Sequence, residues 1–389
     1  MFLNFKEDNI GSKIGATYGT MGIASLFMPA IVGIIADKFL RAELVLAICH
    51  LFAGIFIYYA GTVTTASEMM YAIFLVSCFY MPTIALSNSV SFSLLSKNNF
   101  DIQKTFSPIR VWGTVGFIVA EWTVDLMGWT GNNSQFKFAA LIEFITALYC
   151  LSLPSVGLVK NEESKSIISR FGLDAFQLFK ESRMAIFFIF SALLGAALQV
   201  TNMFGSAFLQ NFANVPEYSD TFAVKHSVVL ISLSQVSETL FILTLPFFLK
   251  RFGIKVVMLI SMLAWVFRFY LFGIGNPGPG LHWLILSMIV YGMAFDFFNI
   301  SGSLFVDKEA PQKIRNSAQG LFMVMTNGVG GILGGIFAGK VVDYYTDAGV
   351  VNWNHTWFAF SAYALVLTIL FWIFFKYEHI PEDLKDFKH

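Results

Sequence analysis

Residues 33–41 read Gly-Ile-Ile-Ala-Asp-Lys-Phe-Leu-Arg and connect two long apolar stretches, residues 12–36 and 43–61. A helix needs roughly 20 residues to cross the hydrocarbon core of a membrane, and both stretches reach that length. Lys38 and Arg41 therefore fall in a short turn between two predicted membrane helices. The same layout repeats along the chain, which predicts eleven crossings, at residues 12–36, 43–61, 68–95, 106–127, 135–156, 184–210, 225–249, 255–275, 281–306, 316–343 and 354–376.

Lysine and arginine gather in alternate gaps between these stretches. The interleaved gaps hold only Lys6, Lys13, Lys137 and Lys225. Cytoplasmic loops of membrane proteins carry an excess of lysine and arginine. The pattern therefore predicts an all-α polytopic membrane protein with a cytoplasmic C-terminus. The residues assigned to the cytoplasmic side are Lys38, Arg41, Lys97, Lys104, Lys160, Lys165, Arg170, Lys180, Arg183, Lys250, Arg251, Lys255, Lys308, Lys313, Arg315, Lys376, Lys385 and Lys388.

The composition agrees with a membrane protein and excludes several other classes. Of the 389 residues, 56% are hydrophobic and 13% are charged, which is unlike a soluble globular protein. A formal net charge of zero argues against a nucleic-acid partner, because binding phosphates needs a basic surface. Cys49, Cys78 and Cys150 all lie inside apolar stretches and lack metal-ligand spacing. We expect no metal, no cofactor and no disulfide.

The number of predicted crossings is odd. With a cytoplasmic C-terminus, eleven crossings place the N-terminus outside, and residues 1–9 are too short and too charged for a signal peptide. Residues 1–5, Met-Phe-Leu-Asn-Phe, look like the end of a helix. We therefore expect a twelfth crossing upstream of Met1, missing from this chain. The alternative is a genuine eleven-helix protein.

The longest predicted cytoplasmic gap runs from Gly157 to Arg183 and divides the chain into two parts. Its second half is either an interfacial helix on the inner leaflet or a solvated loop. The predicted organisation is an N-terminal bundle at residues 1–156, a cytoplasmic linker at 157–183, a C-terminal six-helix bundle at 184–377 and a cytoplasmic tail at 378–389.

The two predicted bundles share one local pattern. Gly33-x-x-x-Asp37-Lys38 ends the first helix of the chain and precedes a short cytoplasmic turn, and residues 246–255 hold the corresponding place in the second half. The first segment resembles the loop motif of the major facilitator superfamily. That resemblance implies two bundles of six helices, with a substrate site between them near the middle of the membrane.

Polar residues form stripes on several predicted membrane helices. A charge near the bilayer centre costs roughly 2.5–3.5 kcal/mol by insertion scales, so each stripe needs an explanation. A stripe on one helix face is typical of a water-filled cavity. The stripes are Arg110, Thr114 and Phe117; Gln199 and Asn202; Gln235 and Glu238; and Tyr291, Phe295 and Asn299, with Asp296 beside them.

Structural roles are the alternative for every member of these stripes. An amide bonded to a neighbouring membrane helix contributes about 0.6 kcal/mol on average. For Arg110, Glu238 and Asp296 the alternative is a buried ion pair that holds two helices together. Arg268 is interpreted as a snorkelling or structural charge. His50 is interpreted as a helix residue with its hydrogen bonds satisfied, and Glu143 has no assigned role.

The residue types in the stripes favour a neutral ligand with a flat ring and several hydroxyl groups. Amides and carboxylates bond the edge of a base or the hydroxyls of a sugar. Aromatic side chains stack on a heterocycle for roughly 1–3 kcal/mol. A plain sugar fits these residue types nearly as well.

Four longer segments carry a more specific resemblance: residues 106–117, 198–205, 234–240 and 295–303. They read FSPIRVWGTVGF, LQVTNMFG, SQVSETL and FDFFNISGS, and they resemble the nucleoside:proton symporter family of the major facilitator superfamily. The resemblance implies import of nucleosides with protons across a bacterial inner membrane. It implies substrate binding by Arg110, Thr114, Phe117, Gln199, Asn202, Gln235, Glu238, Tyr291, Phe295 and Asp296.

Transport is expected to proceed by alternating access, with a proton biasing the equilibrium between two states. Glu238 and Asp296 are the proton-coupling candidates, because coupling needs a group that ionises and is reprotonated at modest cost. We expect a monomer in the lipid bilayer that is not an enzyme, since no nucleophile–base or metal set is evident. The alternatives are a major facilitator carrier of sugars or other polyols, and an inactive or truncated nucleoside-binding membrane protein.

Overall fold

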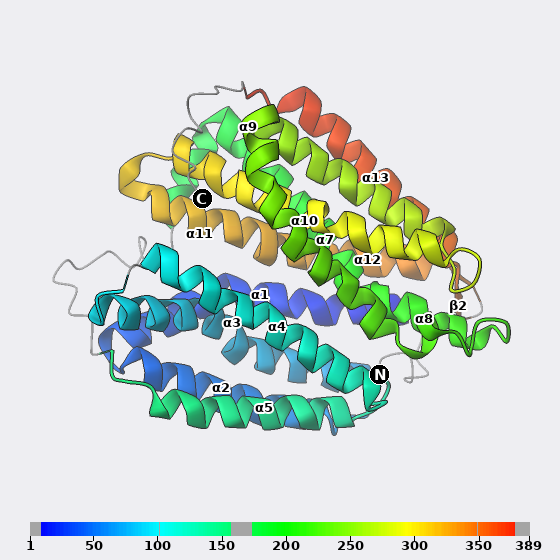
Figure 1. Ribbon diagram of the computed structural model, residues 1–389, viewed down its shortest axis with the longest axis horizontal. Helices are drawn as coiled ribbons and strands as arrows, with labels where there is room; N and C mark the ends of the chain where they lie inside the picture. The colour runs from blue at the N-terminus through cyan, green and yellow to red at the C-terminus, as the bar shows by residue number, and fades with distance from the viewer. Residues whose placement is uncertain (1–8, 101, 157–172, 348, 378–389) are drawn as a thin grey trace. The chain divides into compact units, whose positions relative to one another are not determined.

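The computed structural model describes residues 9–100, 102–156, 173–347 and 349–377. The chain forms two compact units, residues 1–171 and 172–389, and the elements of both are almost entirely helical (Figure 1). Among the described residues, nine helices are long and apolar enough to cross a membrane. They cover residues 11–36, 42–60, 66–97, 134–152, 182–214, 227–274, 281–309, 317–344 and 353–374.

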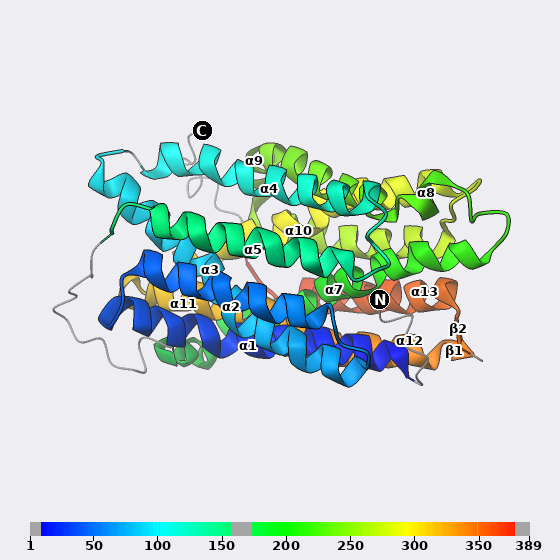
Figure 2. The same cartoon turned by 90° about the horizontal axis from the view of Figure 1, so that it is seen from below.

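The first unit is a helical bundle centred on its second and third helices. Its described elements are α1 (Ile10–Lys38), α2 (Ala42–Ala60), α3 (Ala66–Lys97), α4 (Ile102–Leu126) and α5 (Ser134–Ser152). α2 packs against both α3 and α5, and α1 packs against α3; α2 and α5 lie side by side in both views (Figures 1 and 2). The expected crossing at 106–127 forms most of α4, which carries four charged residues and is not among the nine apolar helices.

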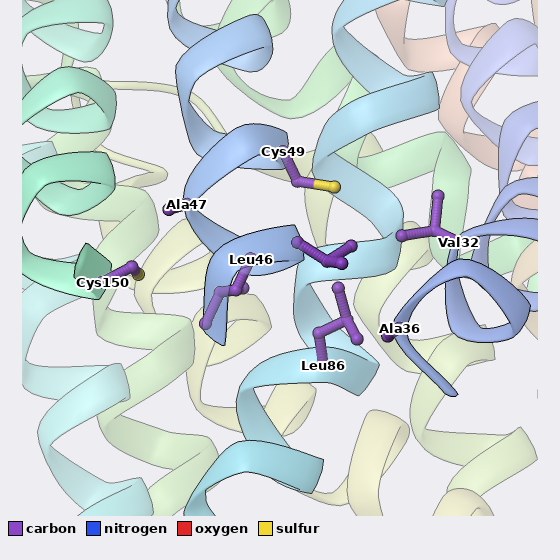
Figure 3. Packing of buried hydrophobic residues seen from close by; sticks show 8 residues of the cluster. Val32, Ala36, Leu46, Ala47, Cys49, Leu86 and Cys150 are labelled. Carbon is purple, nitrogen blue, oxygen red and sulfur yellow. The ribbon is translucent and has the colours of Figure 1, made fainter. Parts of the chain in front are cut away.

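Small and medium-sized side chains close the core of this unit. Val32 of α1, Leu46 and Cys49 of α2 and Leu86 of α3 are all at most 6% exposed and belong to one cluster. In Figure 3, Cys49 points toward α1 and α3, whereas Ala47 points toward α5 on the other side of the helix. Cys49 therefore behaves as a small buried hydrophobe, as its apolar context predicts.

The second unit contains longer helices and two short strands. Its described elements are η2 (Leu173–Lys180), α7 (Ser182–Asn211), η3 (Phe212–Asn214), α8 (Phe222–Lys225), α9 (Ser227–Ile274), α10 (Leu281–Glu309), η4 (Gln312–Ile314), α11 (Arg315–Met323), η5 (Val324–Val329), α12 (Gly330–Tyr344), β1 (Thr346–Asp347), β2 (Val350–Val351) and α13 (Trp353–Phe374). The strands pair antiparallel in the turn between α12 and α13. The predicted linker falls partly outside the described residues, and its last part forms the 3₁₀ helix η2 against α7 and α11.

α9 is 48 residues long but is not one straight helix. Gly253 has φ 76° and ψ 170°, a backbone conformation essentially restricted to glycine, and it breaks the helix. The chain reverses direction at Gly253. The hydrogen bond that Arg268 of the second half donates to Ser234 of the first half shows that the two halves lie side by side. The two stretches predicted at 225–249 and 255–275 are therefore separate arms that share one turn, with exposed Lys250 and Arg251 beside it.

A second irregularity occurs where α11 passes into α12. Residues Val324–Val329 form a π-helical turn, η5, inside the stretch predicted as one crossing at 316–343. Here the backbone comes very close to α7: a Cβ placed on Gly195 would lie 2.1 Å from the carbonyl oxygen of Thr326. Gly330 meets the same part of α7, since its own Cβ would lie 2.8 Å from the carbonyl oxygen of Ala192. Glycine at these positions lets the two backbones touch.

Gly195→Ala should destabilise the protein, because the new methyl group meets backbone atoms that have no rotamer to change. Overpacking of this kind costs about 1–3 kcal/mol. The measurement is the thermal unfolding midpoint of the detergent-solubilised protein, which should fall by several degrees. Gly205→Ala on the same helix is the control, because its Cβ would meet side-chain atoms at ordinary contact distances of 3.6 Å and 3.8 Å. Equal midpoints for the two variants would contradict the close approach.

Candidate functional site

Two of the predicted substrate-binding aromatic residues lie together on α10. Tyr291 and Phe295 are four residues apart and share a face of the helix. Their rings are stacked, with centroids 6.1 Å apart and an angle of 3° between the planes. The Trp265 ring of α9 meets Tyr291 edge-on, at 5.8 Å and 88°. The three rings form an aromatic wall within the second unit, of the kind that stacks against a flat ligand.

Arg268 holds this wall from behind. Its guanidinium carbon lies 4.3 Å from the centroid of the Tyr291 ring and 5.1 Å from that of Phe272. Its Nη1 donates to Ser234 Oγ at 3.3 Å and to the Ser287 carbonyl at 3.0 Å. Arg268 is only 2% exposed, so the snorkelling interpretation is wrong and the structural one is confirmed. The residue ties both arms of α9 to α10 and fixes the Tyr291 ring.

The two proton-coupling candidates lie on helices that pack against each other. Glu238 belongs to the first arm of α9 and Asp296 to α10. Gly292 of α10 packs so closely on α9 that a Cβ there would lie 2.6 Å from the Ser237 carbonyl. Asp296 is 7% exposed, and its Oδ2 has no hydrogen-bond partner among the described residues. A buried ion pair, the alternative role for these two acids, is not found in the described part of the chain.

The predicted amides differ in their surroundings. With the Gln235 amide turned so that its nitrogen faces the backbone, Nε2 donates to the carbonyls of Ile231, at 3.2 Å, and Ser232, at 3.0 Å, within its own helix. Gln199 is half-buried beside α12, whereas Asn202 is exposed on the same face of α7. The predicted amides thus come from α7 and α9 of the second unit.

The three remaining predicted residues belong to α4 in the first unit. Thr114 is half-buried, and Phe117 is 52% exposed on the same helix face. The Arg110 side chain lies outside the described residues. That these three share one cleft with the residues of the second unit stays a prediction.

The structure adds site residues that the polar stripes did not single out. A pocket in the second unit is lined by Phe295 and by Trp265, Thr326 and Asn327, among others. Thr326 and Asn327 are adjacent polar residues inside an apolar, glycine-rich stretch, a signal that was present in the sequence. Their position on a π-turn was not readable from it.

His50 and Glu143 are partners in a side-chain contact between α2 and α5. The His50 ring nitrogen Nδ1 lies 2.6 Å from Glu143 Oε2, and the side chains are 13% and 15% exposed. This pair joins α2 to α5 within the first unit. The expectation of a satisfied His50 is confirmed, and Glu143 has a partner.

Comparison with known proteins gives consistent matches over nearly the whole chain. The family described as "Nucleoside H+ symporter" matches residues 2–380. The nucleoside permease NupG of Escherichia coli K12 is 51% identical over 381 residues, which cover 98% of this chain and 91% of that protein. The xanthosine permease of the same organism is 50% identical over 376 residues, covering 96% and 90%.

Solved structures agree. The crystal structure of the nucleoside transporter NupG superposes with a TM-score of 0.91 at 51% identity, over 97% of this chain and 93% of that one. A D-xylose-proton symporter superposes with a TM-score of 0.69 at 14% identity, over 96% and 90%, which is a likeness of fold alone.

The His50–Glu143 pair should stabilise the first unit. Removing one member leaves a largely buried polar partner, at a cost of about 2 kcal/mol. A double-mutant cycle with His50→Ala and Glu143→Ala, measured by unfolding in mixed micelles, should give a coupling energy above about 1 kcal/mol. The control cycle uses Arg183 and Glu309, which are 52% and 25% exposed and should couple by at most about 0.5 kcal/mol. Equal coupling in both cycles would be evidence against the buried pair.

Proposed function

The chain belongs to the nucleoside H+ symporter family, and on that basis we propose that it imports nucleosides together with protons. The observation that carries this proposal is the match over residues 2–380, together with half or more of the residues shared with two permeases along almost their full length. The NupG and xanthosine permeases are by name transporters of nucleosides. The relatives are permeases, so transport and not catalysis is the activity to test.

The side chains of the second unit fit such a substrate. Phe295, the half-buried ring of the stacked pair, offers a flat apolar face to a nucleobase, which contributes roughly 1–3 kcal/mol per stacked base, and the buried Tyr291 ring supports it. The amides of Gln199, Asn202 and Gln235 provide donors and acceptors for base edges and ribose hydroxyls. Thr114, Phe117 and Arg110 complete the proposed set from α4.

Proton coupling is assigned to Glu238 and Asp296. When both are ionised, two negative charges lie on helices that pack against each other, and a proton on either one reduces the repulsion. Bound substrate and bound proton then favour the same conformation, which is the thermodynamic requirement for symport.

The proposal also includes the membrane topology, the membrane in which the protein lies and its oligomeric state. The lysine and arginine distribution supports eleven crossings with the C-terminus in the cytoplasm, and the bacterial relatives support the inner membrane. We propose that a single chain is the functional unit.

Purified protein in proteoliposomes should accumulate labelled uridine and adenosine when the inside is alkaline. The accumulation depends on the proton gradient, so a protonophore should abolish it. Excess unlabelled adenosine should compete for uridine uptake and excess glucose should not. Competition by glucose would favour the sugar-carrier alternative. Binding of nucleoside without any flux would favour the inactive nucleoside-binding protein.

Glu238→Gln should abolish uphill accumulation, because the amide cannot exchange a proton. Counterflow, in which unlabelled nucleoside inside drives entry of labelled nucleoside, should persist because it needs no proton gradient. The same assays on Asp296→Asn show which carboxyl group carries the proton. Asp220→Asn is the matched control, since the Asp220 side chain is 91% exposed in a loop. Proton-driven accumulation in both Glu238→Gln and Asp296→Asn would disprove coupling through these groups.

A further inference from the structure

The 3₁₀ helix η2 belongs to the predicted linker, and none of its residues is assigned to the proposed transport. It packs against α7 and α11. The apolar span on α7 begins at Ser182, just after the end of η2, and the span that includes α11 begins at Ser317. α11 has nine residues and is therefore only about 13.5 Å long at 1.5 Å per residue. η2 thus lies close to the points where two apolar spans begin.

The contacts of Arg183 show which other helix ends lie at this level. Its Nη1 donates to Oε2 of Glu309, the last residue of α10, at 3.0 Å. Its guanidinium carbon lies 5.9 Å from the centroid of the Tyr377 ring, just beyond the end of α13. The start of α7 and the ends of α10, α13 and η2 therefore lie together. Because α7, α10 and α13 are apolar spans, this is the level at which they leave the membrane.

The outward side of η2 is half apolar and half polar. Residues three apart lie directly above one another in a 3₁₀ helix, so their side chains form three stripes. The stripes are Ala175 and Leu178; Phe176 and Phe179; and Asp174, Gln177 and Lys180. The first stripe faces the protein, since its two side chains are 0% and 2% exposed. The apolar second stripe and the polar third stripe divide the rest of the helix surface lengthwise.

The protein covers the apolar stripe only in part. The rings of Phe176 and Phe179 are stacked, with centroids 5.8 Å apart and 19° between the planes. The Phe179 ring in turn meets that of Phe188 on α7 at 5.4 Å. Phe176 is nevertheless 48% exposed. Its ring is therefore supported from behind and presented outward, where an apolar phase would complete its burial.

The cationic side chains beside this ring suit phospholipid phosphates. Lys180 is exposed at the end of the polar stripe. The Arg183 side chain is 52% exposed although one nitrogen binds Glu309, and a guanidinium carries five N–H donors. The acids of this short segment are Asp174 and Glu181. An outward aromatic ring next to lysine and arginine, at the level where helices leave the membrane, is typical of a helix that lies in the headgroup layer.

We propose that η2 binds the phospholipid surface at this end of the second unit, with Phe176 among the acyl chains and Lys180 and Arg183 at the phosphates. Under the proposed topology, this surface is the inner leaflet. Of the two possibilities for the second half of the predicted linker, the interfacial helix is then correct and the solvated loop is wrong. The contact fixes the depth at which α7 enters the bilayer, and it requires a membrane location but no nucleoside transport.

Spin labelling tests which medium surrounds each outward stripe. Cys49→Ala, Cys78→Ala and Cys150→Ala give a background without thiols, and a nitroxide is attached through Phe176→Cys or Gln177→Cys. In liposomes of phosphatidylethanolamine and phosphatidylglycerol, relaxation of the label by oxygen, which concentrates in hydrocarbon, is compared with relaxation by a water-soluble nickel chelate. We expect the label at 176 to lie about 5–10 Å below the phosphates. The label at 177 should lie at or above them.

Gln177 is the matched control, because it is exposed like its neighbour Phe176 but lies on the polar stripe. Equal access of the nickel chelate to both labels would show a solvated helix and overturn the proposal. A label at 176 that neither reagent reaches would show that protein covers the ring, and this result overturns the proposal as well.

A second measurement uses the unaltered chain, so it does not depend on the folding of a thiol-free variant. The liposomes contain a phosphatidylcholine with a diazirine on its acyl chain, and after illumination the adducts are mapped by mass spectrometry. We expect adducts within residues 173–180 as well as in the apolar spans. The loop at residues 215–221 lies outside the spans and should carry none. Labelled spans beside an unlabelled η2 would contradict the contact with lipid, whether or not the protein transports nucleosides.

Discussion

Backbone amides and carbonyls inside a membrane must find their hydrogen bonds within the protein, because the hydrocarbon core offers no water. This constraint makes nearly every described element of the chain a helix. It also gives meaning to the few places where the helix pattern is altered. Gly253 breaks α9 at a turn flanked by exposed cationic residues. The π-turn η5 keeps its backbone bonded while changing which side chains face α7.

Within the second unit, Arg268 has a different role from the two acids Glu238 and Asp296. Arg268 is entirely enclosed and occupied by two serines and two aromatic rings, so its charge serves to hold helices and to orient Tyr291. Glu238 and Asp296 lie elsewhere on the same two helices and lack such a cationic partner among the described residues. A carboxyl pair without a fixed counter-charge is free to exchange a proton, whereas a neutralised pair would stay ionised. The proposed proton coupling therefore requires that Arg268 forms no ion pair with Glu238 or Asp296.

The sequence was sufficient for what depends on short-range pattern. Apolar length and charged gaps predicted the helices and located the reversal of α9 between Leu249 and Lys255. Helical spacing also predicted that Tyr291 and Phe295 share a face, as they do. Relations between distant residues were not predictable in this way. His50 and Glu143 are 93 positions apart, and their contact depends on α2 packing against α5.

The residues that line the pocket in the second unit were also only partly predictable from the sequence. Phe295 was singled out because it lies on a polar stripe, but Asn327 stands on a turn whose geometry follows from contact with α7. A helical wheel assumes a constant rotation per residue, and η5 departs from it. Residues after such a turn are assigned to the wrong face by any reading that treats the stretch as one regular helix.

The bare contact between Gly195 and Thr326 has a mechanical consequence. No side chain separates the two backbones at that point, so there is no soft layer to compress or slide when the molecule changes shape. The segments flanking it should travel as a single stiff block during each cycle of transport.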